Sequence, residues 1–160
     1  MAVAYVVTCC CNPGPSSPAK TTSSSSSSAP PSFATTKGNN LRVGRRNYNG
    51  HRSKPISKDE AMKELTEVVD DDWQVTKIKP DNFTPRIAEK TEDYIRVEYE
   101  SPIFGFVDDV EFWFPPGNKP IVQYRSASRS GFVDFNANKK RVKELRLALE
   151  KKGWASESNF

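Results

Sequence analysis

The stretch VDDVEFWFPPGNKPIVQYRSAS, residues 107–128, decides the fold, because it predicts two β-strands connected by a turn. In Val107–Phe114, side chains alternate with the period of two that a strand requires. Pro115–Asn118 is a strong turn signal, and Ile121–Ser128 follows as the second strand. The alternation also places Trp113 opposite Phe112, where we expect it to be exposed as a contact patch.

Further strands precede this pair. Tyr94–Ser101 alternates cleanly, with Ile, Val and Tyr on one face and Arg and Glu on the other. The residues Thr91–Asp93 before it are typical of a hairpin turn. Trp73–Lys79 and, more weakly, Pro85–Ala88 complete a predicted set of four to five antiparallel strands.

Helices are predicted on both sides of the strands. Ser57 and Glu60 form a capping box, and apolar residues then recur at helical spacing. We expect this helix to end at Asp70–Asp72, because carboxylates oppose the dipole at a helix C-terminus. A second helix is predicted over Ala137–Lys152, with Gly153 as its C-terminal cap and Trp154 folding back on the core.

These elements predict an α+β fold: an antiparallel sheet of four to five strands, with an N-terminal and a C-terminal helix packed on one face. The predicted domain covers residues 57–155, after a linker at 51–56 and before a tail at 156–160. About a hundred residues are enough for one modest core.

Residues 1–50 differ sharply in composition and predict a disordered leader. Residues 1–58 contain no Asp or Glu and carry a charge of +8, whereas residues 59–160 carry −4, which together give the net +4. A basic, Ser-rich, acid-free segment is typical of an organelle transit peptide. We therefore expect a chloroplast protein, in the stroma rather than the thylakoid lumen. A secretory signal and a retained flexible tail are the alternatives.

Composition also limits the chemistry. The only cysteines are Cys9, Cys10 and Cys11, and the only histidine is His51, so the domain holds neither residue type. This excludes from the domain a disulfide, a thiolate nucleophile and a Cys/His zinc site. The mildly acidic domain argues against nucleic-acid binding. No apolar run has the ~20 residues of a membrane span, and we expect no cofactor and no metal.

The strand motifs carry a family resemblance. Val107–Glu111 spells VDDVE, Arg125–Gly131 spells RSASRSG, and Asp134 and Asn138 lead to KRV at Lys140–Val142. In this combination, over about residues 57–153, the chain resembles the plant and bacterial family known as domain of unknown function 1499 (DUF1499), as a chloroplast member. That uncharacterised family has no agreed activity, so the resemblance implies fold and location more than function.

The same motifs contain the candidate site residues. Asp108 and Asp109 point to opposite sheet faces, and a buried carboxylate there needs a cationic partner. Arginine is suited to this because of its bidentate geometry. Asp134 or Asn136 is expected to cap the last helix. The predicted polar set is Asp108, Asp109, Glu111, Arg125, Ser126, Ser128, Arg129, Asp134, Asn138 and Arg141.

Three interpretations of this set stay open. It is a structural network that ties the sheet to the last helix. Alternatively, Arg125, Arg129, Ser126 and Ser128 hold a phosphate or carboxylate at the helix N-terminus. In the third, Asp109 and Glu111 bind Mg²⁺ or Ca²⁺, although two carboxylates are few for a calcium cage.

The sequence therefore favours a soluble, non-catalytic binding or assembly module, with an unknown protein partner or a small anion as its ligand. The alternative is a small carboxylate-dependent enzyme in which Asp109 or Glu111 acts as acid or base. No nucleophile with an adjacent base is evident in the domain.

Overall fold

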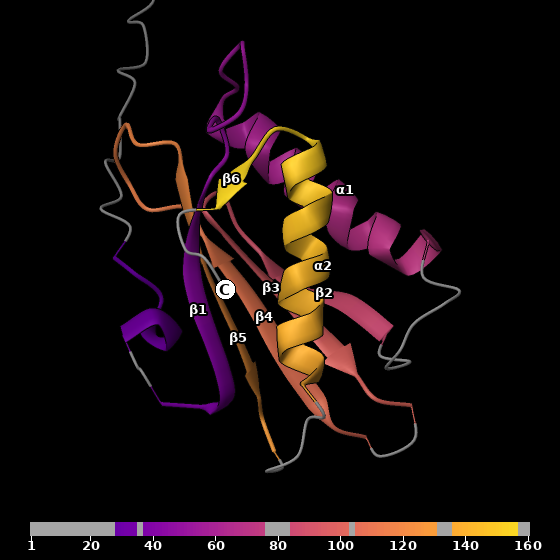
Figure 1. Ribbon diagram of the computed structural model, residues 1–160. Helices are drawn as coiled ribbons and strands as arrows, with labels where there is room; N and C mark the ends of the chain where they lie inside the picture. Colours follow the sequence, from indigo (N-terminus) through magenta and orange to yellow (C-terminus); the bar gives the residue numbers. More distant parts are fainter. Residues whose placement is uncertain (1–27, 35–36, 76–83, 103–104, 131–135, 157–160) are drawn as a thin grey trace, which may run out of the picture.

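The computed structural model describes residues 28–34, 37–75, 84–102, 105–130 and 136–156 (Figure 1). The chain is α+β. The elements, in order, are the 3₁₀ helix η1 (Pro31–Ala34), β1 (Asn39–Asn47), α1 (Lys58–Val75), β2 (Thr84–Lys90), β3 (Tyr94–Glu100), β4 (Val107–Trp113), β5 (Ile121–Ser128), α2 (Ala137–Lys151) and β6 (Ala155–Ser156).

The strands form a six-stranded antiparallel sheet in the order β2-β3-β4-β5-β1-β6. Strands β2 to β5 follow one another as a meander, because each connection is short enough to join neighbours. The hairpin between β2 and β3 turns at Thr91, whose N–H donates to the carbonyl of Tyr94. The register aligns Val97 with Val110, and Val110 with Ser126, so these side chains share one face.

Both helices cover that face, which we call the inner face (Figure 1). The core joins apolar side chains of α1 and α2 to the inward positions of the strands. Its fully enclosed members include Leu65, Ile95, Val97, Val110, Val122, Leu149 and Trp154. Removal of this apolar surface from water is the main force that holds the layers together. The opposite side of the sheet is called the outer face below.

Helix α1 begins as predicted but ends later. The N–H of Ser57 donates to Glu60 Oε2 at 2.8 Å, and the N–H of Glu60 donates to Ser57 Oγ at 3.2 Å, which completes the capping box. The expected helix end at Asp70–Asp72 is wrong, because α1 continues to Val75. A carboxylate near a helix C-terminus costs only about 0.3–1 kcal/mol. The strand predicted from Trp73 is therefore helix as far as Val75, and residues 76–79 lie outside the described part.

Helix α2 ends at the predicted glycine. Gly153 adopts a φ of 93°, its N–H donates to the carbonyl of Glu150 at 3.0 Å, and the N–H of Trp154 donates to the carbonyl of Leu149 at 3.1 Å. This Schellman pattern reverses the chain, because glycine enters the left-handed region without a steric penalty. The reversal buries Trp154 against Tyr48 and places β6, which includes residue 156 of the predicted tail, beside β1.

Strand β1 corrects the predicted domain boundary. It lies within the segment 1–50 that the composition assigned to a disordered leader, yet it pairs with β5 from Asn47↔Ile121 to Asn39↔Ser128. The sheet therefore has six strands instead of four to five. Gly44 explains part of the fit, since a Cβ there would lie 2.5 Å from the hydroxyl of Tyr124. The prediction for residues 1–27 lies outside the described part of the chain.

The predicted linker 51–56 is held by contacts at both ends. Asn49 Oδ1 accepts from the N–H of Ile56 at 2.9 Å, and Asn49 Nδ2 donates to the carbonyl of Ile56 at 3.2 Å. Arg52 forms an ion pair with Glu64 of α1, and its Nε donates to the carbonyl of Tyr48 at 3.0 Å. These contacts fix the passage from β1 to α1.

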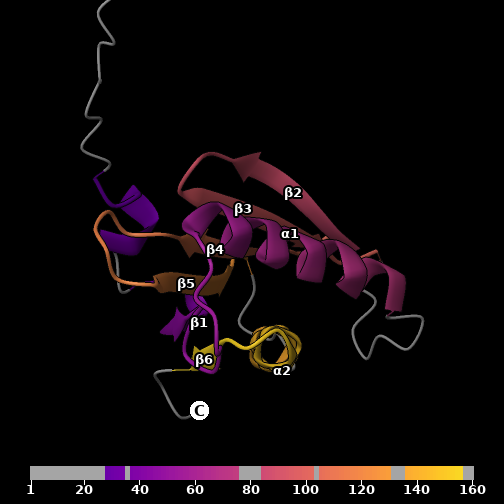
Figure 2. The same ribbon diagram turned by 90° about the horizontal axis from the view of Figure 1, so that it is seen from above.

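The outer face is covered in part by η1, which lies on the side of β4 and β5 away from α2 (Figure 2). Phe33 packs on Trp113 with ring centroids 5.9 Å apart. The expectation that Trp113 is exposed is therefore wrong, because its side chain is buried. The covering residues come from the segment that the sequence analysis had placed in the leader.

We predict that chains truncated at the two candidate N-terminal boundaries of the domain, Ser28 and His51, differ in thermal stability. A chain that begins at Ser28 keeps η1 and β1 and unfolds cooperatively. A chain that begins at His51 lacks both, so the edge of β5 and the Trp113 ring become exposed, and its melting temperature falls steeply. Thermal melts followed by circular dichroism measure the difference. Equal melting temperatures would show that β1 is dispensable.

Candidate functional site

The inner face holds a buried polar cluster made by β4, β5 and α2. Its members are Asp108, Ser126, Ser128, Asn138 and Arg141. The side chains of Asp108 and Arg141 are each only 3% exposed. Asp108, Ser126 and Ser128 reach this face because they alternate with Asp109 and Ala127 along their strands. We call this set the buried cluster.

One ion pair organises the buried cluster. Arg141 Nη1 donates to Asp108 Oδ2 at 3.0 Å and to Asn138 Oδ1 at 3.1 Å. The Arg141 guanidinium also lies 4.2 Å from the centre of the Tyr99 ring, a favourable cation–π distance. A buried carboxylate without such a partner would be strongly destabilising.

Asn138 links the ion pair to the adjacent strand. Its Nδ2 donates to Ser128 Oγ at 2.8 Å, and its Oδ1 accepts from Ser126 Oγ. Both polar atoms of the amide are thus used. Buried and mutually hydrogen-bonded, these groups join the first turn of α2 to β4 and β5. They form a polar network between the sheet and α2.

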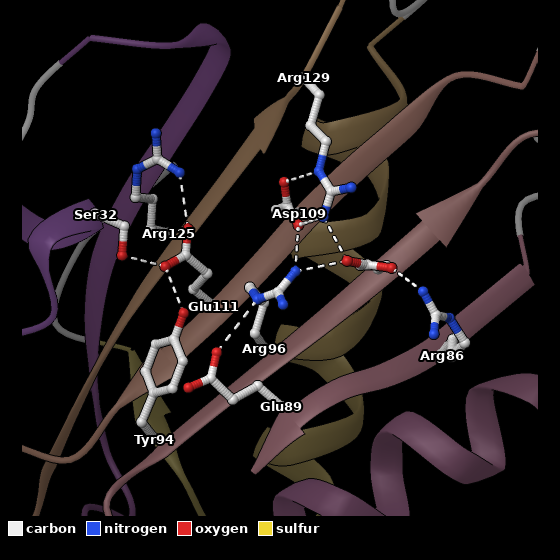
Figure 3. A network of polar contacts seen from close by, with 10 residues as sticks. Ser32, Arg86, Glu89, Tyr94, Arg96, Asp109, Glu111, Arg125 and Arg129 are labelled. Atoms are coloured by element: carbon white, nitrogen blue, oxygen red, sulfur yellow. Dashed lines mark hydrogen bonds and ion pairs between the residues drawn. The ribbon is translucent and has the colours of Figure 1, made fainter. Parts of the chain in front are cut away.

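The outer face carries a different, solvent-bordering network (Figure 3). Cross-strand register places Glu89 opposite Arg96, Arg96 opposite Glu111, and Glu111 opposite Arg125. Charges therefore alternate across four strands, an arrangement that stabilises neighbouring strands. A second row adds Arg86, Glu98, Asp109 and Arg129. We call these eight residues the charge ladder, and its four arginines balance its four carboxylates.

Arg129 is held by two carboxylates. Its Nε donates to Asp109 Oδ2 and its Nη2 to Asp109 Oδ1, each at 2.7 Å, while Nη2 also contacts Glu98. The hydrogen bonds to Asp109, followed by that to Glu98, raise the pKa of the guanidinium. The hydrogen bond from Arg129 likewise lowers the pKa of Glu98 from 4.5 to about 2, with a further contribution from Arg96.

Glu111 is enclosed by three donors. Arg125 Nη1 donates to its Oε1 at 2.9 Å, and Tyr94 Oη and Ser32 Oγ both donate to its Oε2, the former at 2.8 Å. The pKa of Tyr94 is raised, first by burial and then by the hydrogen bond to Glu111. Ser32 belongs to η1, so this carboxylate also anchors η1 to the sheet.

A hollow of about 440 Å³ opens on the outer face, between η1 and the strands. Its wall combines carboxylates, guanidinium groups, hydroxyls and prolines, so it suits a small polar molecule better than an apolar one. The lining residues are Pro30, Pro31, Ser32, Glu89, Thr91, Asp93, Tyr94, Arg96, Asp109, Glu111 and Arg129.

The structure divides the sequence-predicted set between two faces. Asp108 and Asp109 do point to opposite faces, and each contacts an arginine, as expected. The four residues expected to surround one anion do not converge, because Ser126 and Ser128 are buried against Asn138 on the inner face. Arg125 and Arg129 contact carboxylates on the outer face.

The expected helix cap is also different. Asn136 occupies the N-cap position of α2 in a left-handed conformation and makes no side-chain cap hydrogen bond. Asp134 lies outside the described residues. For the metal interpretation, Asp109 and Glu111 do share a face, but each holds a different arginine. Within the described ranges, no group of three or more His, Cys, Asp or Glu side chains is placed to hold a metal ion.

Sequence reasoning missed half of the charge ladder. Arg96 and Glu98 were visible as the polar face of Tyr94–Ser101, although nothing local indicated their partners. Arg86 lay in the weakly predicted strand Pro85–Ala88, and Glu89 lay just beyond its predicted end. Ser32 carried no signal, because its segment was assigned to the leader.

We predict that the two adjacent aspartates differ in their effect on stability. Asp108→Asn leaves Arg141 without its buried counter-charge and lowers the free energy of unfolding by about 3–5 kcal/mol. Asp109→Asn acts on a solvent-bordering pair, where the loss is about 0–1 kcal/mol. Urea unfolding of both variants measures the contrast. Similar losses would mean that burial does not control the energetics of these pairs.

The pKa of Glu98 predicts an acid-dependent contribution. Because the folded-state pKa is depressed, the ionised carboxylate stabilises the fold at pH values above about 4.5. That contribution is lost as the pH falls through about 2. We therefore expect Glu98→Gln to be less stable than the parent at neutral pH and equal to it only below about pH 2. The exposed Glu100→Gln serves as control, and a constant difference at every pH would contradict the assignment.

Comparison with known proteins gives a family but no activity. A search of curated proteins finds no match to the chain. A scan of protein families matches residues 12–149 to the family described as "Protein of unknown function (DUF1499)". The match spans most of the chain, including β1 and both polar networks. The chain therefore belongs to the DUF1499 family.

Proposed function

We propose that this chain is a non-catalytic binding module of the chloroplast stroma, and that it holds the anionic group of a small ligand at Arg129. The observation that carries the proposal is the geometry of this one guanidinium. It lines the hollow, its side chain is 45% exposed, and two carboxylates fix its orientation.

Arg129 keeps one edge for a ligand. Its Nε and Nη2 are used by Asp109 and Glu98, whereas its Nη1 donates to none of the residues that the structure describes. A guanidinium that is already oriented loses little entropy when it binds a phosphate or carboxylate. The ligand's neutral and hydroxyl groups would then face Tyr94 and Ser32 across the hollow.

The enzyme alternative receives less support from the same contacts. A general acid needs a protonated carboxyl, and a general base needs an oxygen within reach of substrate. Glu111 accepts hydrogen bonds from three donors, and both oxygens of Asp109 accept from Arg129. These donors occupy the positions where a substrate proton would be transferred.

The targeting part of the proposal is adjusted to the fold. The acid-free composition of the first residues supports a plastid transit peptide. Since η1 and β1 contribute to the folded domain, we place the end of the transit peptide before Pro30 rather than at residue 50. Among the described residues, no helix is long and apolar enough to cross a membrane.

We predict that inorganic phosphate stabilises the full chain through Arg129. At phosphate concentrations a hundredfold above the dissociation constant, the stabilisation amounts to about 2.7 kcal/mol. The melting temperature of the parent rises with phosphate at constant ionic strength, and Arg129→Gln abolishes the rise.

Arg86→Gln is the matched control, because Arg86 also contacts Glu98 but does not line the hollow. We expect this variant to respond to phosphate like the parent. If all three proteins respond alike, phosphate acts on the protein as a whole and the proposed site is wrong. If none responds, the anion assignment fails.

A further inference from the structure

Strand β1 has two hydrogen-bonding edges, and one of them is paired with another strand over only part of its length. Toward β5, it pairs continuously from Arg42 to Asn47 and again at Asn39, with a shift of register between Asn39 and Arg42. Toward the other side, β6 pairs only with Arg46 and Asn47. From Asn39 to Arg45, β1 therefore pairs with no other strand on that side among the residues that the structure describes. Alternate residues of an antiparallel strand direct their N–H and C=O groups to opposite sides, so this edge offers main-chain hydrogen bonds.

The side chains along this edge are cationic and uncompensated. Arg42 and Arg45 are exposed. Arg42 donates only to the carbonyl of Leu41, at 3.1 Å, and neither arginine has an ion-pair partner among the described residues. The arginines of the charge ladder, by contrast, each contact a carboxylate. Between the two free cations lies Val43, one of the few large apolar side chains that is exposed, at 51%.

These features select the kind of strand that fits. A second copy of β1, paired antiparallel about Val43 and Gly44, would bring arginine against arginine, and directly opposed like charges are destabilising. An acidic strand would instead neutralise both cations. We propose that the edge of β1 from Asn39 to Arg45 binds an extended acidic segment of a partner protein by β-strand addition.

The register of β1 in the sheet predicts which residue types the partner strand needs at each position. Arg42 and Arg45 are an odd number of residues apart, so they project to opposite faces of the sheet, while Val43 shares a face with Arg45. The added strand therefore needs two acidic residues three positions apart, with an apolar residue between them opposite Val43. Main-chain hydrogen bonds supply affinity, and the two ion pairs supply selectivity.

The test uses the full chain and a synthetic peptide. The peptide is a fluorescently labelled threonine-rich strand that carries two glutamates three positions apart and a valine between them. Fluorescence anisotropy at low ionic strength measures its binding. We expect binding by the parent and a loss of about tenfold or more in the double variant Arg42→Glu/Arg45→Glu, since two attractions become two repulsions.

Three controls make the result specific. The double variant Lys63→Glu/Lys140→Glu changes the net charge equally at exposed helix positions and should bind like the parent. A peptide with glutamine in place of glutamate should bind weakly. Two further peptides are N-methylated at every second residue, one at the odd and one at the even positions. Only one edge of the peptide pairs with β1, so one of these two peptides should lose binding and the other should keep it.

The opposite outcomes are equally definite. An equal loss of peptide binding in both double variants would mean that net charge alone attracts the peptide. Unchanged binding of both N-methylated peptides would exclude strand addition. No binding by the parent would overturn the proposal, as would a dimer in sedimentation that the single variant Arg42→Glu stabilises, since this change sets a glutamate against Arg45 of the second copy. None of these outcomes depends on Arg129, so this proposal and the anion site fail separately.

Discussion

The ion pair between Asp108 and Arg141 is the interaction on which the arrangement of the two layers depends. It lies in the core, where an unpaired charge is unacceptable, so α2 must sit where its guanidinium meets β4. Asn138 and the Tyr99 ring then fix the first turns of α2. The far end of the same helix delivers Trp154 to the core and β6 to the edge of β1. One buried contact therefore governs both the sheet cover and the sheet edge.

On the outer face, charged side chains are neutralised by a network of ion pairs that is partly open to solvent. Neither α1 nor α2 covers this face, and it remains polar because arginines and carboxylates alternate across four strands. Such a ladder is inexpensive in free energy because water still reaches part of it. Its consequence for function is that most guanidinium and carboxylate groups are already engaged. The proposed anion would therefore meet the exposed edge of Arg129, beside the hollow that η1 borders on one side.

The two proposed binding regions differ in how their arginines are compensated. At the hollow, Arg129 is oriented by Asp109 and Glu98 before any ligand arrives, which favours a small, geometrically defined anion. Along β1, the arginines are uncompensated and lie beside main-chain groups that can accept another strand. A small ligand and an extended acidic segment can therefore occupy the domain together.

The sequence by itself determined the local elements: the β4–β5 strands and their turn, the alternation that sends Asp108 and Asp109 to opposite faces, the Ser57 capping box and the Gly153 end of α2. These follow from nearest-neighbour geometry, which a window of a few residues contains. Only the tertiary structure decided that β1 belongs to the sheet. Its basic, acid-free sequence is typical of a leader, and only its pairing with β5 identifies it as a strand. The same holds for Trp113, which is buried by Phe33 from about eighty residues away, and for the separation of Ser126 and Ser128 from the outer-face arginines. Whether a segment joins the sheet, and which side chains are buried, depends on pairing partners that are distant in sequence, and no local pattern encodes those partners.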